Sequence, residues 1–305
     1  MKLTYQWNIT GHQRQLAALE NELLTGQTSH AYLFSGPQQV GKFSVAKVMA
    51  HILQCEQNFC HSCPTCIQIE KGYHPDTIEM ADAGTSIKIE GVRDVLARLY
   101  MTTQSPYKIL LMQNIERMTL EAANALLKTL EEPPGQVKFL LTTGNIKMVP
   151  ATILSRVRLY QFHHLPASQM AELFLQHRPG FHDDERATLA ALALGKPGKA
   201  LALLENDELY HAAKKMYDDL QELFQSRDRA AQFSYIAEMA KDDHLTQDFL
   251  DVFLALLRQE LLKQGADNAQ LLRVTDLITH VEEAQNMLRH NVNTRLVLEN
   301  LMLSL

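Results

Sequence analysis

The first half of the chain alternates short apolar runs with longer segments whose apolar residues recur at helical spacing. Apolar runs of strand length cover residues 31–34, 108–112 and 137–141, and the turn sequence Ser35-Gly36-Pro37 follows the first of them. In residues 43–53 the apolar side chains instead lie three or four positions apart, which predicts an amphipathic helix.

A second helix is predicted between the last two of these strands. Thr119 is a suitable N-cap residue, and the helix should run to Glu132, where Pro133 and Pro134 stop it. Because these strands read as buried and alternate with helices, they indicate a mostly parallel sheet with helices on both faces. The sequence therefore predicts an α/β fold for residues 1–162.

The pattern changes after Phe162, since nearly every later segment has the period of an amphipathic helix. Residues 163–207 are expected to form a small helical lid domain. Residues 208–305 are expected to form a helical bundle. Apolar residues of one row of this bundle are Phe249, Val252, Phe253, Leu256 and Leu257. The chain thus divides into three predicted domains.

The composition is that of a folded protein without a strongly basic surface. With 305 residues, of which 46% are hydrophobic, the chain is long enough for several cores. A net charge of −6 argues against a free-standing DNA-binding protein, although partners in a larger assembly could supply cations for DNA contact. Residues 1–7 lack the apolar region of a signal peptide, and no apolar run is long enough to span a membrane. We therefore expect a cytoplasmic protein with no membrane partner.

A phosphate-binding loop is predicted after the first strand. The sequence from Gly36 through Gly41 to Lys42 fits the P-loop pattern, in which backbone amides cradle phosphates and the lysine neutralises the β- and γ-phosphates. The next residue of that pattern is a serine or threonine that holds magnesium, but here it is Phe43. Ser44 is a poor substitute, because it is turned by about 100° around the helix.

The second magnesium ligand of such a site is also missing. It should be an acid at the end of the next core strand, but residues 113 and 114 are Gln113 and Asn114. Glu116 lies two residues further on, and we expect it to be a solvated surface acid. Hydrolysis of ATP by this chain alone is therefore not expected, and the magnesium site is predicted to be lost. Phosphate occupancy of the loop stays open.

The four cysteines of the chain fall within twelve residues, Cys55, Cys60, Cys63 and Cys66. Four thiolates in one compact loop suit tetrahedral zinc and leave no open position for catalysis, so we expect a structural zinc site. An iron–sulfur cluster is the alternative metal group. Such dense spacing favours one metal site in a reducing compartment over scattered disulfides.

Taken together, these features resemble bacterial DNA polymerase III clamp-loader subunits of the AAA+ superfamily. The resemblance covers most of the first 200 residues. It is carried by residues 29–34, the four cysteines, His74-Pro75-Asp76, residues 89–93, 122–134 and 152–156. It implies an AAA+ P-loop domain with a zinc module at residues 55–66, followed by the lid and by a collar domain that mediates oligomerisation. The first cysteine gap is four residues here and usually eight in that family.

The resemblance also implies roles for individual residues. In relatives a Ser-Arg-Cys motif provides an arginine finger, and here Ser155-Arg156-Val157 matches the arginine but not the cysteine. Arg156 would reach into the ATP site of a neighbouring subunit, with Arg158 as the competing candidate. The threonine that senses the γ-phosphate would be Thr142 or Thr143.

Other residues complete the degenerate nucleotide site that the resemblance implies. Gly36, Gly41 and Lys42 would be its phosphate-binding residues. The lid arginine expected near residues 195–199 is absent, because only lysines flank that position.

Within this family the altered loop and the missing acids favour the delta-prime subunit. The expected function is a non-hydrolysing stator of the DNA polymerase III holoenzyme, which completes a neighbour's ATP site during sliding-clamp loading. Its partners would be the gamma/tau and delta subunits and, through the complex, the sliding clamp and primed DNA. The alternatives are an ATP-hydrolysing motor of the gamma/tau kind, using Ser44 and Glu116, and a zinc-containing interaction protein of another complex.

Overall fold

The computed structural model describes most of the chain and divides it between Leu165 and Pro166 into two compact units. The described residues are 4–57, 59–81, 84–178, 180, 182–225, 228–262, 268–289 and 292–304. The α/β unit therefore ends three residues after the predicted boundary at residue 162. The predicted separation of lid and collar at residue 207 falls inside the second unit and stays a prediction.

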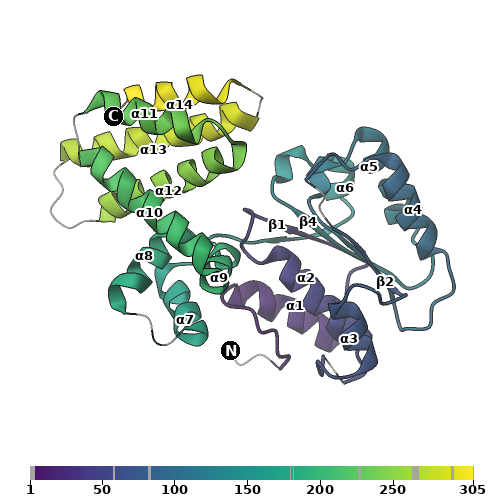
Figure 1. The fold of residues 1–305 in the computed structure, drawn as a ribbon. Coiled ribbons are helices and arrows are strands. Elements are labelled where there is room, and N and C mark those ends of the chain that lie inside the picture. The colour runs from purple at the N-terminus through teal and green to yellow at the C-terminus, as the bar shows by residue number, and fades with distance from the viewer. Residues whose placement is uncertain are drawn as a thin grey trace. The chain divides into compact units, whose positions relative to one another are not determined.

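A parallel sheet forms the centre of the first unit (Figure 1). Its strands are β1 (Ala31–Ser35), β2 (Thr77–Met80), β3 (Lys108–Met112), β4 (Val137–Thr143) and β5 (Arg158–Gln161). In the described part of the chain the strand order is β2-β3-β4-β1-β5, and every neighbouring pair is parallel. The predicted parallel α/β fold is confirmed.

Helices cover both faces of this sheet. They are α1 (Gln13–Thr25), α2 (Lys42–Gln54), α3 (Pro64–Glu70), α4 (Ile89–Leu99), α5 (Leu120–Glu131) and α6 (Ala151–Leu154), with 3-10 turns at Ile115–Arg117 and Ile146–Met148. Successive side chains of a strand point to opposite faces. Tyr32 and Phe34 of β1 accordingly pack with α1 and α2, whereas Ala31 and Leu33 pack with α4 and α5.

The sequence fits the observed ends of α5. The Thr119 hydroxyl accepts a hydrogen bond from the amide of Ala122 at 3.3 Å, so the predicted N-cap is confirmed. The helix ends at Glu131, one residue earlier than predicted, and Glu132 is its C-cap. Pro133 and Pro134 follow directly. Proline has no backbone N–H group, so Pro133 cannot continue the helix.

A buried carboxylate joins α1 to the strands on one side of the sheet. Glu22 of α1 is 4% exposed and accepts hydrogen bonds from the hydroxyls of Tyr32 and Tyr160. Arg158 adds an ion pair to it, with 2.9 Å between Nε and Oε1. A buried charge needs partners of this kind, and these fix α1 against the starts of β1 and β5.

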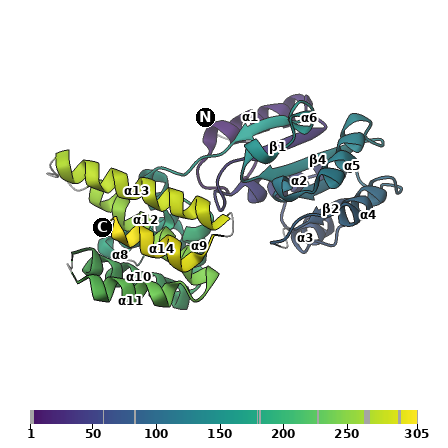
Figure 2. The same cartoon turned by 90° about the horizontal axis from the view of Figure 1, so that it is seen from above.

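Eight helices make up the described part of the second unit. Their bounds are α7 (Ala167–His177), α8 (Asp183–Ala193), α9 (Pro197–Glu205), α10 (Asp207–Gln225), α11 (Arg229–Met239), α12 (Asp243–Leu262), α13 (Asn268–Arg289) and α14 (Thr294–Leu303). In both views α12 and α13 run side by side (Figures 1 and 2). The predicted apolar row of α12 is buried, from Phe249 to Leu257. Among the described residues, no helix combines the length and apolar character that a membrane crossing requires.

Candidate nucleotide site, arginine and cysteine cluster

The predicted phosphate loop connects the end of β1 to the start of α2. Gly36 passes so close to the end of β5 that a Cβ atom there would lie 2.2 Å from the carbonyl oxygen of Phe162. Gly41 is the N-cap of α2 and has a φ of 94°, a left-handed conformation that favours glycine. Both glycines of the motif are therefore required by the backbone itself.

Lys42 is turned into its own loop. Its ammonium group donates hydrogen bonds of 2.6 Å to the carbonyl oxygens of Gly36 and Pro37, and the residue is only 6% exposed. Burial lowers the pKa of Lys42 to about 8, and the negative charge of Glu116 opposes that shift. The cation that would meet a phosphate is thus held by backbone oxygens.

The residues beside Lys42 lie as the sequence predicts. Phe43 is partly buried and packs against the core under α2, where it offers no oxygen to a metal. Ser44 is exposed on the surface of α2. Just after β3, the backbone amide of Asn114 donates to the Thr142 hydroxyl at 3.1 Å.

The two candidate threonines end β4, next to the loop. Thr142 and Thr143 are both buried, at 2% and 0% exposure. The hydroxyl of Thr143 accepts a hydrogen bond from the Asn145 amide at 3.2 Å, and its carbonyl accepts one from the Gly36 amide at 3.1 Å. The structure therefore brings these threonines, Gly36 and Lys42 together at the carboxyl ends of the strands.

Glu116 also belongs to this edge, so its expected position as a solvated surface acid is wrong. Its Oε1 atom accepts a hydrogen bond of 2.7 Å from the amide of Gly144, which directly follows β4. Its Oε2 atom is buried and has no hydrogen-bond partner among the described residues. The physical reason is the 3-10 turn after β3, which carries the side chain inward over the end of β4.

The two candidate finger residues lie at the other end of the strands, where the amino ends are. Arg156 precedes β5 and is 36% exposed, and its Nη2 atom pairs with Oε1 of Glu131 at 2.7 Å. Its Nη1 atom donates to the carbonyl of Thr152 at 2.8 Å. The competitor Arg158 is bound to the buried Glu22, which gives it a structural role.

The strand register separates Arg156 from the phosphate loop of its own chain. Arg158 pairs with Tyr32 at the amino end of β1, whereas Gly36 follows the carboxyl end of that five-residue strand. From the level of Arg158 to Gly36 is four residues, or about 13 Å at about 3.3 Å per residue, and Arg156 lies two residues before Arg158. Arg156 cannot contact a phosphate on its own loop, but it can be presented to another molecule.

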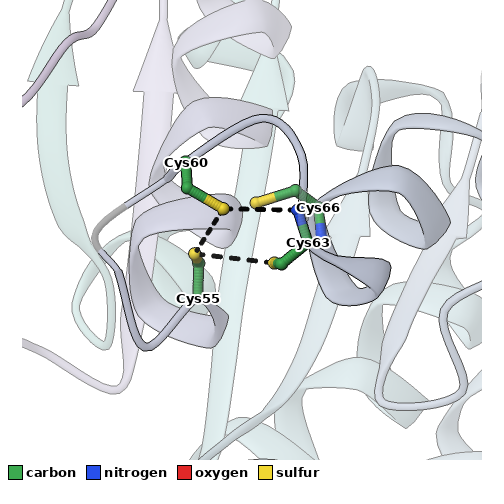
Figure 3. Close-up of side chains that lie close together, drawn as sticks. All are labelled: Cys55, Cys60, Cys63 and Cys66. Atoms are coloured by element: carbon green, nitrogen blue, oxygen red, sulfur yellow. Dashed lines mark hydrogen bonds between the residues drawn. The ribbon is translucent and has the colours of Figure 1, made fainter.

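The four cysteine sulfurs point toward one centre (Figure 3). Cys55 follows α2, and Cys63 is the N-cap of α3, which carries Cys66. The sulfurs of Cys55 and Cys60 are 3.8 Å apart, as are those of Cys55 and Cys63, and all four ligand atoms lie within 4.8 Å of one another. A tetrahedron with Zn–S bonds of about 2.3 Å has edges of about 3.8 Å, so the cluster fits a zinc ion.

Hydrogen bonds prepare part of this cluster for metal binding. Backbone hydrogen bonds from Ser62 and Cys63 lower the pKa of Cys60 to about 6, which favours its thiolate. Burial raises the pKa of Cys66 to about 12. A buried thiol of this kind is deprotonated when a metal cation supplies the compensating charge.

The two lysines near the position expected for a lid arginine form ion pairs within the second unit. Lys199 and Lys196 pair with the carboxylate of Asp251 on α12, at 2.8 Å and 3.3 Å. This arrangement joins α9 to α12.

Sequence reasoning gave no role to Glu131 and placed Glu116 in solvent. Glu131, the partner of Arg156, ends the helix stopped by two prolines, and a C-terminal helix acid beside a cation could have been suspected from the motif. Glu116 had a weaker indication, namely its place just after a core strand. Its direction depends on the turn and on Gly144, which are far apart in sequence.

Comparisons with known proteins agree with this geometry. The family model described as "DNA polymerase III, delta subunit" matches residues 11–166. The chain is 42% identical to the DNA polymerase III tau subunit of Escherichia coli over 161 residues, covering 51% of this chain and 25% of that subunit. It is 28% identical to the delta-prime subunit of Bacillus subtilis over 96% of this chain and 95% of that one.

The tau relatives are much longer proteins, and the chain spans about a quarter of the length of those from Salmonella typhimurium and Escherichia coli. Among solved structures, a DNA polymerase III gamma-subunit-related protein from Thermotoga maritima shares the fold. The TM-score is 0.54 at 18% identity, with 93% of this chain and 96% of that one covered. The family match over half of the chain shows that this protein belongs to the clamp-loader family of DNA polymerase III.

Proposed function

We propose that the chain acts as a delta-prime-like stator of the clamp loader, which does not hydrolyse ATP itself. It presents Arg156 to the ATP of a neighbouring gamma/tau subunit while the complex loads the sliding clamp on primed DNA. The delta subunit is the other expected partner, and the second unit supplies the collar through which the subunits assemble. A full-length relationship to a delta-prime subunit supports this assignment.

The observation that carries the proposal is the separation of Arg156 from the chain's own phosphate loop. The guanidinium group lies at the amino ends of the strands and is 36% exposed. A planar, permanently charged guanidinium is suited to a γ-phosphate supplied in trans. In the free subunit Glu131 holds this group, so a neighbour's phosphate would replace one anion by another.

The loss of metal ligands supports the absence of turnover. Phe43 offers no hydroxyl for magnesium, and Gln113 and Asn114 offer no carboxylate. Magnesium neutralises the charge that develops during phosphoryl transfer, so the chain alone lacks the groups for this step.

The cysteine cluster is proposed to hold a structural zinc ion. Its sulfur spacing fits a closed tetrahedral shell, and closed zinc shells stabilise folds without taking part in catalysis. Free thiols at this density also suit a reducing cytoplasm.

The test is ATP turnover by the purified chain alone and in a mixture with gamma/tau and delta subunits. We expect no turnover alone. In the mixture, Arg156→Ala should lower the DNA-stimulated rate about twofold or more, since a finger contributes roughly a thousandfold at the one site it serves. Arg158→Ala is the matched control and should leave the rate per assembled complex unchanged.

Gel filtration of the mixture measures assembly and so distinguishes the loss of the finger role from a failure to join the complex. An Arg156→Ala mixture that assembles and turns over ATP at the original rate would remove the finger role. A chain that never joins gamma/tau and delta would instead be an interaction protein of another complex.

A gamma/tau-like motor is the second candidate, favoured by the 42% identity to tau over the first half of the chain. It would require Ser44 and Glu116 to replace the missing magnesium ligands. Robust magnesium-dependent turnover by the isolated chain would support it over the stator.

A further inference from the structure

Among the described residues, three acceptors hold the guanidinium group of Arg156, and one of them is charged. Nη1 donates to the carbonyl oxygen of Thr152 at 2.8 Å and to the hydroxyl of Ser155 at 3.0 Å. Thr152 belongs to α6, and Ser155 is the C-cap of that helix. Nη2 pairs with Oε1 of Glu131, the last residue of α5, at 2.7 Å. The charge of the arginine is therefore balanced by a carboxylate from another helix.

The pair between Arg156 and Glu131 lies where a competing anion can reach it. The two side chains are 36% and 44% exposed, and the carboxylate lies at the C-terminal end of α5, where the helix dipole disfavours negative charge. The pair of Arg158 with Glu22 differs, because Glu22 is 5% exposed and also accepts hydrogen bonds from two tyrosine hydroxyls. An exposed pair contributes little to stability, so it can break at low cost.

We propose that Glu131 is a competing counter-ion that holds Arg156 back from the γ-phosphate of a neighbouring subunit's ATP. The inference rests on the proposed finger role of Arg156 and adds the regulation of that role. A carboxylate and a γ-phosphate both accept charge-assisted hydrogen bonds from a guanidinium group, so they compete for its donors.

This competition has a consequence for nucleotide affinity at the neighbour's site. The apparent affinity for ATP is reduced by the fraction of subunits in which Arg156 is free of Glu131. ADP has no γ-phosphate with which to displace the carboxylate. Its affinity therefore does not depend on Glu131.

The test is a calorimetric titration of the complex assembled with gamma/tau and delta subunits, with magnesium and without DNA. The ligands are ATPγS, which is hydrolysed slowly, and ADP. The main variant is Glu131→Gln, which keeps the shape of the side chain and removes its charge. Glu132→Gln is the matched control, because it removes the same charge at the next residue, which is exposed and is the C-cap of the same helix.

We expect Glu131→Gln to lower the dissociation constant for ATPγS about threefold at the site that Arg156 serves, because an ion pair between partly exposed side chains is weak. That site is the one whose affinity for ATPγS falls in Arg156→Ala. The dissociation constant for ADP should stay unchanged, and Glu132→Gln should bind like the original chain. In the double variant of Arg156→Ala and Glu131→Gln the tighter binding should disappear, since no guanidinium group remains to be released.

The results distinguish a failure of this inference from a failure of the finger role. If Arg156→Ala changes the affinity of no site, the finger role is lost and the inference with it. If Arg156→Ala weakens one site but assembled Glu131→Gln binds ATPγS there no more tightly than the original chain, the finger role stands and the competition is refuted.

Two further outcomes would overturn the inference. Tighter binding that persists in the double variant, or that ADP shares, would trace the effect to the charge of α5 and not to the release of Arg156. Gel filtration shows which variants assemble. The shorter Glu131→Asp, which should tighten ATPγS binding less, decides if Glu131→Gln fails to assemble.

Discussion

Asp76 shows how much one buried charge can hold together. The residue is 1% exposed, and its carboxylate accepts a hydrogen bond of 2.9 Å from Lys108. The backbone amides of Gln104 and Ser105 donate to its other oxygen at 2.8 and 2.9 Å. This side chain therefore ties the loop before β3 to the start of β2, which gives the His74-Pro75-Asp76 motif a structural role.

Replacing Asp76 by asparagine should destabilise the first unit at neutral pH. Lys108, with 6% of its side chain exposed, would remain as a buried charge without its carboxylate, at a cost of about 3–5 kcal/mol. The measurement is urea unfolding of Asp76→Asn, compared with Asp94→Asn at an exposed position of α4. A loss no larger than that of the control would contradict this role.

The same pair predicts a dependence of stability on pH. Burial alone would raise the pKa of Asp76, but the hydrogen bonds from Lys108, Gln104 and Ser105 outweigh it and lower the pKa. The contribution is then fully present above the unfolded pKa of about 4 and is lost as the pH falls through the lower folded value. The difference in unfolding free energy between the original chain and Asp76→Asn should accordingly shrink below about pH 4.

At the nucleotide site, the positions of some residues could be predicted from the sequence and those of others could not. Local rules sufficed for Phe43 and Ser44, because one residue of helix rotation, about 100°, separates the packed side chain of Phe43 from the exposed one of Ser44. Glu116 required knowledge of the contact with Gly144, 28 positions away. Lys42 was assigned correctly to the loop, but its hydrogen bonds to the carbonyls of Gly36 and Pro37 could not be predicted from the pattern.

The length and burial of each strand decided whether it could be predicted from the sequence. Strands β1, β3 and β4 are buried along their whole length, so each is rich in apolar residues, with Lys108 and Lys138 as exceptions. By contrast β2 and β5 have four residues each and lie at the two edges of the sheet. Three of the four residues of β5 are exposed, and therefore no apolar run marks it.

The cysteine loop and α3 form the element whose folding should depend on a metal. We expect about one zinc ion per purified chain, and Cys66→Ser should lose it together with part of the thermal stability. Metal analysis and thermal unfolding are the measurements, and chelation of the original chain should reproduce the loss of stability. Ser62→Ala, which removes a neighbouring hydroxyl but no thiol, is the control.

Two results would change this assignment. A chain that carries no metal and unfolds at the same temperature after chelation would leave the cysteines as free thiols. Iron and labile sulfide with visible absorption would instead identify an iron–sulfur cluster.

For the whole molecule, the second unit raises the question of whether residues 163–207 and 208–305 are separate domains. Asp251 lies on the collar side of that boundary, and Lys196 and Lys199 lie on the lid side. All three side chains are at most 19% exposed. These ion pairs favour lid and collar helices that unfold together.

Asp251→Ala should therefore weaken the second unit across that boundary. We expect the free energy of unfolding of the second unit to fall by about 2 kcal/mol. Charged hydrogen bonds of this kind contribute roughly 1.5–3 kcal/mol each, and partial exposure reduces that value. Hydrogen exchange should rise in both α9 and α12. Lys241→Ala, which breaks an exposed pair with Glu238, should change little; equal effects of the two substitutions would argue for independent domains.

The hydrogen bonds of Lys42 to its own loop have a consequence for how the stability of the protein depends on ligands. A ligand that binds only the folded state raises the unfolding free energy as its concentration rises. Here the ammonium is satisfied by two carbonyls of its own backbone, so the loop would need no such ligand to be complete. If the loop excludes nucleotides, the melting temperature of this chain would not follow the supply of ATP, whereas that of a nucleotide-binding neighbour would. During energy depletion the thermal stability of this chain would then stay constant.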